Sequence, residues 1–502
     1  MRRKLVCLLT AMTLVLGVSL AFSKTSHADD KIKVVTTFYP VYEFTKEVMG
    51  DEGDVSLLIK AGTEPHDFEP STKDVAKIQK ADSFVYMDDN METWVSSVKK
   101  TVGDSSKFIK GTGDMLLLAG SEEEHEESGK SHSHAYDPHV WLSPKRAKTV
   151  VENIRDGLIK AYPDKKETFT KNAAVYITKL EALDKSYETA LSKAKQKSFV
   201  TQHAAFSYLA LDYGLNQIAI TGVSPETEPT AKRLAELAKY IKKYDIKYIY
   251  FEETASSKVA KTLADEAGVK TAVLNPIESL TSKQEKAGES YISIMKSNLK
   301  ALQKTTSVKG KEIKAESDAS EKTVENGYFK TSAVKNRTLS DWSGNWQSVY
   351  PYLEDGTLDQ VWDYKAKLNK DKTAEEYKAY YTTGYKTDVT NISIDGSKNT
   401  ITFTQNGEKK TFTYKYVGYK ILKYKKGNRG VRYLFETEDK DAGEFKYVQF
   451  SDHGIKPQTA AHFHLFWGST SQDDVLKEMD NWPTYYPEKL SGHEIAQEMV
   501  AH

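Results

Sequence analysis

The strongest restriction on the fold is a change of pattern at residues 305–323, which separates two unlike halves of the chain. Before this segment, short apolar runs alternate with amphipathic stretches, whereas after it Tyr and Trp become dense and apolar and polar residues alternate singly. A chain of 502 residues also exceeds what one hydrophobic core usually organises. Residues 305–323 are rich in Lys, Glu and Ser, which is typical of a linker. The sequence therefore predicts separate domains of different architecture.

The first half, from Lys31 to about Gln303, is typical of repeated βα units. The expected strands are Ile32–Thr37, Val55–Ile59, Ser83–Met87, Phe199–Thr201, Gln217–Ile220, Lys247–Phe251 and Thr271–Leu274. The expected helices include Thr72–Lys80, Lys145–Lys160, Pro229–Lys243 and Ser257–Ala267. This alternation predicts an α/β fold with largely parallel sheets.

One segment of the first half differs from the others in length. Asp164–Lys195 has helical spacing and contains neither Gly nor Pro, which predicts an uninterrupted helix of roughly 30 residues and about 45 Å. A helix of that length could brace two lobes.

The second half carries the period of two that is expected of half-buried strands. Alternating runs occupy residues 391–394, 400–404, 411–416 and 430–435. Asp395-Gly396 and Asn406-Gly407 are hairpin turn signals between several of them. We therefore expect an antiparallel β barrel or sandwich with a few short helices.

The N-terminus has the features of a secretory signal over residues 1–28, which predicts an exported protein. Basic residues 2–4 precede the apolar stretch Leu5–Phe22, and Ser26-His27-Ala28 supplies small residues for cleavage. An uncleaved membrane anchor is the alternative, although the apolar stretch is short for a span. The only cysteine, Cys7, lies at the near end of this stretch. The mature chain therefore has no thiolate for a metal, and we expect no lipid anchor at Cys7.

The charge balance excludes one class of function. The chain has 71 acidic and 71 basic residues and no long basic cluster, so the electrostatic footprint of a nucleic-acid-binding protein is missing.

Three histidines of the first half stand near the ends of predicted strands. They are His66, His139 and His203, and Glu278 follows at a similar spacing. Because ligands of open α/β sheets collect beyond the carboxyl ends of the strands, all four could meet in a cleft between two lobes. Three imidazoles and one carboxylate suit tetrahedral Zn²⁺. The alternative is that each histidine is a satisfied core or loop residue.

The contexts of these residues resemble the cluster of ABC solute-binding proteins for zinc and manganese, over about Lys31–Gln303. The motifs that carry the resemblance are Thr36–Pro40, Gly62–Pro70, Asp137–Pro144, Thr201–Phe206 and Phe251–Glu253. The resemblance implies two α/β lobes joined by one long rigid helix. It also implies that His66, His139, His203 and Glu278 are the metal ligands. Manganese members have a carboxylate where this chain has His203, and an imidazole there favours zinc.

An acidic stretch, Ser121–His134, contains His125, His132 and His134. It resembles the His-rich loop of zinc members, which implies a weak zinc collector beside the cleft. The alternative is a solvated loop without a role in binding.

The second half has its own group of histidines. On a strand, His462 and His464 would share one face and Phe463 would occupy the other. His453 lies nine residues before His462, and a turn past Gly454 could return it to the same face. Three such imidazoles form a plausible metal site.

Residues from about Val324 to His502 resemble ZinT, a lipocalin-like periplasmic zinc-binding protein, through Leu339–Trp346, Tyr381–Tyr385 and the His-x-His strand. The fusion resembles the AdcA-type zinc-binding proteins. The resemblance implies a zinc solute-binding domain at 29–304, a ZinT-like domain at 324–502, and one Zn²⁺ in each. It implies that His453, His462 and His464 are ligands. It further implies a monomeric extracellular protein, not an enzyme, that delivers Zn²⁺ to an ABC permease and its ATPase subunit.

Two other functions stay open at this point. Three histidines and an open position also describe a catalytic zinc, although the chain has no His-Glu-x-x-His motif. The second alternative is a surface adhesin, or a barrel with an organic ligand, in which the metal is structural. The composition of the linker further predicts that few contacts connect the two halves.

Overall fold

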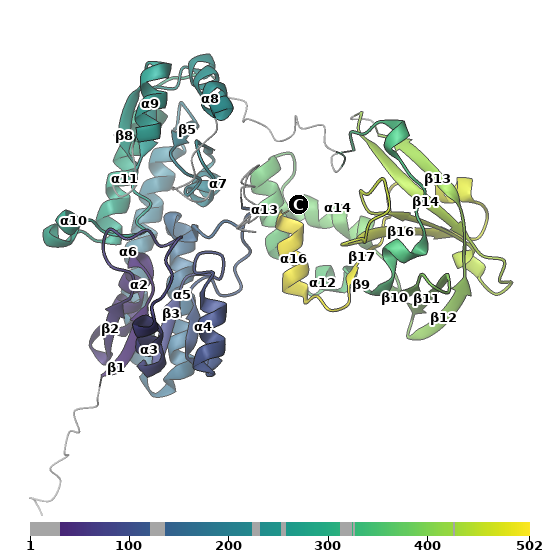
Figure 1. Ribbon diagram of the computed structural model, residues 1–502, viewed down its shortest axis with the longest axis horizontal. Coiled ribbons are helices and arrows are strands. Elements are labelled where there is room, and N and C mark those ends of the chain that lie inside the picture. The colour runs from purple at the N-terminus through teal and green to yellow at the C-terminus, as the bar shows by residue number, and fades with distance from the viewer. Residues whose placement is uncertain are drawn as a thin grey trace, which may run out of the picture.

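A computed structural model describes residues 31–120, 136–222, 231–252, 258–311, 324, 327–424 and 427–501. An α/β part comes first in the chain, and a part dominated by one large sheet follows it (Figure 1). The predicted signal at 1–28, the stretch with His125, His132 and His134, and residues 312–323 lie outside the described residues. No helix in the described ranges is long and apolar enough to cross a membrane.

Two parallel four-stranded sheets form the α/β part, as the alternating pattern predicts. The first has the order β2-β1-β3-β4 and the second the order β6-β5-β7-β8. The strands are β1 (Ile32–Thr36), β2 (Gly53–Leu57), β3 (Ser83–Tyr86), β4 (Phe108–Lys110), β5 (Ser198–Thr201), β6 (Asn216–Ala219), β7 (Tyr248–Phe251) and β8 (Lys270–Val273). All seven predicted strands are therefore confirmed. The sequence pattern missed β4 because three residues are too few to show a period.

Helices flank both sheets (Figure 1). Those of the first lobe are α2 (Tyr39–Met49), α3 (Thr72–Lys80) and α4 (Val95–Val102). Those of the second lobe are α7 (Ser207–Tyr213), α8 (Ala231–Tyr244), α9 (Lys258–Ala267) and α10 (Ser282–Ala287). The strand order reverses between β1 and β3 and again between β5 and β7, so each lobe has a switch point where loops can form a site.

Three longer helices connect the lobes: α5 (Pro144–Ala161), α6 (Lys166–Leu191) and α11 (Tyr291–Thr306). Helix α6 has 26 residues, or about 39 Å, and is shorter than expected at both ends. A separate turn at Pro163–Lys165 precedes it. Beyond its other end, the N–H of Lys195 donates to Thr306 of α11 and not to its own helix.

Helix α6 contacts both lobes through a buried face with helical spacing. This face consists of Phe169, Ala173, Tyr176, Leu180, Leu183, Tyr187 and Leu191. The hydroxyl of Tyr176 donates to Glu43 of α2, and that of Tyr187 donates to the Met295 carbonyl of α11. The helix thus braces the two lobes.

The linker begins later than the predicted position 305. Thr305 and Thr306 form the last turn of α11, and both side chains are buried. The hydroxyl of Thr305 is hydrogen-bonded to that of Tyr250 at 2.8 Å. Composition alone does not reveal this, because threonine is common both in linkers and in polar helix turns.

Nine antiparallel strands form the sheet of the second part. They are β9 (Gly344–Ser348), β10 (Val389–Asp395), β11 (Thr400–Gln405), β12 (Glu408–Thr413), β13 (Lys415–Lys423), β14 (Arg429–Glu436), β15 (Tyr447–Ser451), β16 (Phe463–Gly468) and β17 (Thr484–Pro487). The order is β12-β11-β10-β9-β17-β16-β15-β14-β13. Because β12 and β13 are its two edges, the sheet is a curled half-barrel, and the expected mainly antiparallel β architecture with short helices is confirmed. Asn406 and Gly407 both have positive φ in the two-residue turn between β11 and β12, as the Asn-Gly signal predicts.

Short helices cover one side of this sheet and face the α/β part (Figure 1). They are α12 (Tyr350–Glu354), α13 (Asp359–Asn369), α14 (Ala374–Tyr385) and α16 (Gly492–Ala501), and a further turn, α15, spans Gln472–Val475. Leu116 of the α/β part is buried in the apolar cluster that these helices form, with Leu118 and Leu211 packed against it. The expectation of few contacts between the halves is therefore wrong.

Candidate metal centres

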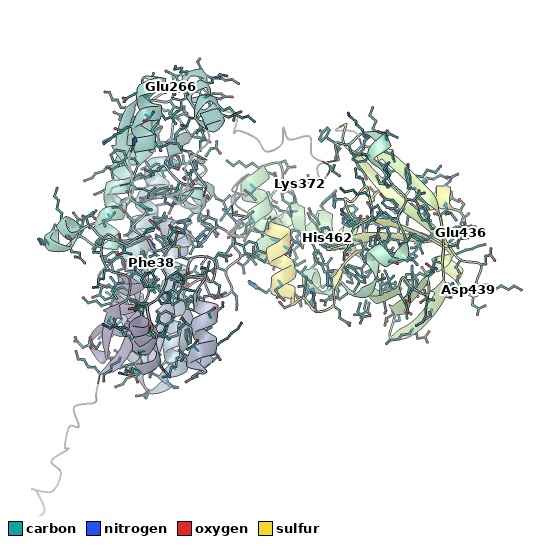
Figure 2. All side chains as sticks on the ribbon, in the orientation of Figure 1. Phe38, Glu266, Lys372, Glu436, Asp439 and His462 are labelled. Atoms are coloured by element: carbon teal, nitrogen blue, oxygen red, sulfur yellow. The ribbon has the colours of Figure 1, made fainter. Side chains whose placement is uncertain are left out.

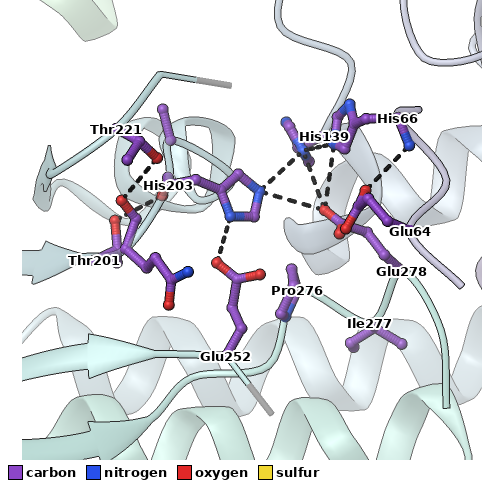
Figure 3. A network of polar contacts seen from close by, with 12 residues as sticks. Glu64, His66, His139, Thr201, His203, Thr221, Glu252, Pro276, Ile277 and Glu278 are labelled. Carbon is purple, nitrogen blue, oxygen red and sulfur yellow. Dashed lines mark hydrogen bonds and ion pairs between the residues drawn. The ribbon is translucent and has the colours of Figure 1, made fainter. Parts of the chain in front are cut away.

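Four predicted side chains meet between the lobes of the α/β part (Figure 3). His66 lies in the loop after β2, and His139 immediately precedes a helical turn at Val140–Leu142. His203 follows β5, and Glu278 follows β8. All four side chains are buried, and one ligand atom of each lies within 4.8 Å of the others. The first lobe therefore supplies two candidate ligands and the second lobe the other two.

The distances between these atoms fit a tetrahedral ion. The Nε2 atom of His139 lies 3.1 Å from Nε2 of His66 and 3.4 Å from Nε2 of His203. The Oε1 atom of Glu278 lies 3.6, 3.3 and 3.3 Å from Nε2 of His66, His139 and His203. A tetrahedral Zn²⁺ with bonds of about 2.0–2.1 Å requires ligand atoms about 3.3–3.4 Å apart. A cation of that size fits the group without large movement.

Carboxylates behind the imidazoles set their orientation. Asp137 Oδ1 accepts from both the backbone N–H and Nδ1 of His139, at 2.9 and 2.8 Å. Glu252 accepts from Nδ1 of His203 (Figure 3). With Nδ1 held as a donor, the Nε2 lone pair of each neutral ring points to the centre of the group, which is the arrangement of a carboxylate–histidine–metal unit.

The loop that carries Glu278 is held by a dense set of hydrogen bonds. Asn298 of α11 accepts from the Asn275 N–H and donates to the Asn275 carbonyl, and the Asn275 side chain accepts from Ile277. Trp141 of the other lobe donates to the Pro276 carbonyl at 2.8 Å. Ile277 has a φ of 59°, a conformation that β-branched residues rarely adopt. The surrounding contacts thus hold a costly backbone conformation that places Glu278.

Burial and hydrogen bonds act in opposite directions on the imidazole pKa values of this group. Burial lowers the pKa of His66 to about 4. Burial also opposes protonation of the other two rings, but hydrogen bonds and charges from carboxylates outweigh it. Asp137 and Glu278 raise the pKa of His139, and Glu252 and Glu278 raise the pKa of His203 well above its usual value. The carboxylates around the group therefore favour a positive charge at its centre, either a proton on these two rings or a bound cation.

Three imidazoles meet on the half-barrel. His453 is exposed, His462 and His464 are partly buried, and one nitrogen of each lies within 4.8 Å of the others. Their ring centroids are 5.8–6.0 Å apart in all three pairs. The residue between the two strand histidines, Phe463, points to the core and is fully buried. His453, two residues after the end of β15, has a φ of 61°, which makes the turn that returns it to this face.

The surroundings of this second group leave an open side. Figure 2 labels His462 in the second part of the fold. Its ring stacks on that of Tyr486 at 5.0 Å, and a cavity of about 750 Å³ opens beside it, lined in part by Trp346 and Glu498. The Thr484 hydroxyl donates to the Trp482 carbonyl and accepts from Nδ1 of His464 at 2.8 Å. Because the hydroxyl has only one proton to donate, Nδ1 carries the ring proton and Nε2 is left to bind a metal.

The sequence did not reveal the residues that orient the histidines. Asp137 stands two positions before His139, which is a usable local signal, and Glu252 lies in a motif with no assigned role. Glu64 lies beside the first group, and burial together with the charge of Glu278 raises its pKa to about 9. The pairing of Thr484 with His464 has no local signal, because it depends on the neighbouring positions of β16 and β17.

Comparison with known proteins gives two matching family models. The first, a zinc-uptake complex component A of the periplasm, matches residues 34–305. The second, a periplasmic lipocalin-like zinc-recruitment protein (ZinT, YodA), matches residues 320–502. Together they cover both parts of the fold.

Individual relatives match over nearly the whole length. The zinc-binding protein AdcA of Streptococcus pyogenes is 64% identical over 516 aligned positions, which cover all of both chains. The zinc-binding lipoprotein AdcA of Streptococcus pneumoniae is 64% identical and covers 96% of this chain and 97% of the relative. The crystal structure of Zn(II)-bound AdcA from Streptococcus pneumoniae superposes with a TM-score of 0.85, covering 94% of this chain and 100% of that one.

Proposed function

The chain belongs to the AdcA family of zinc-binding proteins, and from that premise we propose that it captures Zn²⁺ outside the cell and delivers it to an ABC permease driven by its ATPase subunit. The observation that carries the proposal is the buried group of three Nε2 atoms and one carboxylate oxygen at tetrahedral spacings. A solute-binding protein has to bind its solute and later release it. A site with ligands from both lobes can do this, because movement of the lobes brings the ligands together or separates them.

The ligand set favours zinc over manganese. Imidazole nitrogen and tetrahedral geometry suit Zn²⁺, whereas Mn²⁺ prefers oxygen ligands in an octahedral arrangement. The first site has three imidazoles to one carboxylate, and the second has three imidazoles. We propose His66, His139, His203 and Glu278 as ligands of one Zn²⁺, and His453, His462 and His464 as ligands of another.

The domain assignment follows the same premise. We propose a signal peptide at 1–28, a zinc solute-binding domain from 29 to the end of α11 at Thr306, a ZinT-like zinc-binding domain at 324–502, and a monomer in solution. The half-barrel site is partly exposed, and the lobe site is buried. This difference supports a role for the half-barrel in collecting zinc and for the lobe site in holding it for transfer.

Placement at the cell surface is the proposed location. Relatives include a protein named a lipoprotein, while the only cysteine of this chain is Cys7. An exported protein of an uptake system has to stay near its permease. We propose retention at the outer face of the membrane by a means other than a lipid on Cys7.

The alternative of a zinc hydrolase receives no support. The chain's relatives are zinc-binding proteins of uptake systems and not enzymes. In the first candidate site, moreover, Asp137 and Glu252 accept from Nδ1 of His139 and His203, which is a role in orienting metal ligands.

Zinc uptake by intact cells tests the proposed function. A strain that lacks this protein is complemented with the wild-type chain, with His139→Ala, or with an empty vector, and uptake of radioactive zinc is measured at scarce zinc. We expect uptake only with the wild-type chain. Equal uptake in the strain with the empty vector would show that the protein does not supply the importer.

A further inference from the structure

The two halves of the chain meet on the short segment Leu116–Leu118, which precedes the acidic stretch of the first half. Figure 1 shows α13 and α16 of the second part facing the α/β part there. Leu116 is 1% exposed and lies in the apolar cluster of these helices, which includes Trp362 and Ile495. The second part therefore covers a piece of backbone that belongs to the first.

Gln497 of α16 binds this segment from the side of the second part. Its side-chain oxygen accepts from the Leu117 N–H, and its side-chain nitrogen donates to the Leu117 carbonyl, both at 2.8 Å and both buried. Tyr364 of α13 donates to the Leu116 carbonyl and accepts from Arg146 of the first part. The backbone groups of Leu116 and Leu117 that accept or donate these hydrogen bonds are buried. Leaving them without a hydrogen-bond partner would cost free energy.

The other edge of the segment pairs with Asp137. The Asp137 N–H donates to the Leu118 carbonyl at 2.9 Å. The Tyr208 hydroxyl accepts from the Leu118 N–H and donates to the Asp137 carbonyl. Ala119 and Tyr136 form an antiparallel bridge next to these bonds. The position of Asp137 thus depends on the position of Leu117 and Leu118.

Asp137 in turn holds His139. Its Oδ1 atom accepts from the backbone N–H and from Nδ1 of His139, whose Nε2 lies among the four candidate ligands. A chain of hydrogen bonds, buried at both of its ends, therefore runs from Gln497 in the second part to a candidate zinc ligand in the first.

We propose that the docked second part is a clamp on Leu116–Leu118, and that Gln497 is a positioning residue that keeps Asp137, and through it His139, in place for zinc. The retention of zinc between the lobes depends on this contact. The proposal rests on the proposed zinc site of the α/β part and adds a role for the second part that needs no zinc of its own.

The test uses the full chain with His464→Ala, so that the lobe site is the one that is filled. Zinc-loaded protein is mixed with excess chelator, and the rate of zinc release is followed for Gln497→Met and Tyr364→Phe. Both variants are expected to release zinc faster, by up to the roughly 10–100-fold that loss of a partner bonded directly to a ligand costs in metal affinity. Lys489→Met, an exposed change near α16, is the control and should leave the rate unchanged.

A double-variant comparison separates positioning from general loosening. If Gln497 acts through Asp137, Gln497→Met adds nothing to the effect of Asp137→Asn. Unchanged release rates in both Gln497→Met and Tyr364→Phe, or additive effects with Asp137→Asn, would overturn the proposal. Should Gln497→Met fail to fold, Tyr364→Phe decides alone. Failure of the His464→Ala parent to bind zinc would instead contradict the proposed function.

Discussion

At the scale of single residues, the lobe site depends on charges that stand behind its imidazoles. Glu252 faces Nδ1 of His203 in a fully buried position. A carboxylate there keeps Nδ1 as the donor and makes Nε2 a stronger ligand. Neutral glutamine can still accept the hydrogen bond, so Glu252→Gln removes the charge and keeps the shape.

We expect Glu252→Gln to weaken zinc binding at the lobe site by about 10–100-fold. Competition with a chelator of known affinity measures the change, and Glu236→Gln on the exposed side of α8 is the matched control. Equal zinc affinities of the two variants would mean that the charge of Glu252 does not act on the site.

The raised pKa values of His139 and His203 predict a pH dependence of zinc binding at the lobe site. Neighbouring carboxylates favour the protonated form of both rings in the zinc-free protein, and a protonated ring must lose its proton to bind a metal. Zinc affinity is therefore expected to fall as pH falls through these raised pKa values, and zinc binding is expected to release protons from these rings. His66 adds none, because its pKa is about 4.

The half-barrel site should behave differently. Burial and the neighbouring His453 and His462 lower the pKa of His464 well below its usual value, so this ring is already neutral at pH 7. Calorimetry at pH 7 in buffers of different ionisation enthalpy, on His464→Ala and on His203→Ala, measures the protons released at each site. We expect more protons from the lobe site, and the reverse order would contradict these pKa directions.

At the residue level, the sequence could single out candidate ligands where the chemistry is local. Histidine is rare in this chain, so each one beside a strand end could be singled out. The partners Glu252 and Thr484 could not be predicted, because Glu252 is 49 positions from His203 and Thr484 is 20 positions from His464. Such pairs exist only once the strands are in register.

At the scale of elements, helix α6 carries the connection between the lobes. Leu180 is fully buried in its middle, whereas Val175 on the same helix is 56% exposed. We expect Leu180→Ala to cost about 2–5 kcal/mol in the free energy of unfolding of the α/β part, because it leaves a cavity.

Denaturant unfolding of the full chain measures this cost, and Val175→Ala, which creates no cavity, should change stability by less than about 0.5 kcal/mol. If the two changes had equal effects, the buried face of α6 would not be the contact that holds the lobes.

The acidic stretch 121–134 is a second element whose role can be tested by removal. Ala119 and Tyr136 pair across its base, so a short turn can replace it without moving the site. Its acidic residues should attract a cation without contributing to a core.

We expect deletion of 121–134 to leave zinc affinity at the lobe site nearly unchanged and to slow zinc capture at scarce zinc. Stopped-flow binding and equilibrium titration separate the two effects. A large loss of affinity would mean that His125, His132 or His134 is a ligand.

The pattern of elements was largely readable from the sequence, but the closure of the second sheet was not. Hydrophobic alternation placed β10, β11 and β14, and Asn406-Gly407 placed a turn. Whether β12 and β13 pair with each other depends on the twist that accumulates over all the strands of the sheet. No single residue in the sequence signals that twist.

At the scale of the whole molecule, the linker and the contact between the halves carry different information. The composition of 305–323 indicates a change of domain, since polar residues dominate it. The linker composition does not indicate which surfaces of the two parts touch. Leu116 and Gln497 lie at that contact although they are 381 positions apart along the chain. The docking of the second part therefore had to come from the structure.

The central claim is that two separate groups of histidines each hold one Zn²⁺. Native mass spectrometry of the full chain, saturated with zinc and then freed of excess metal, measures how many ions remain bound. We predict two ions for the wild-type chain, one for His203→Ala, one for His464→Ala and none for the double variant. One ion in the wild-type chain, or two in the double variant, would contradict the account.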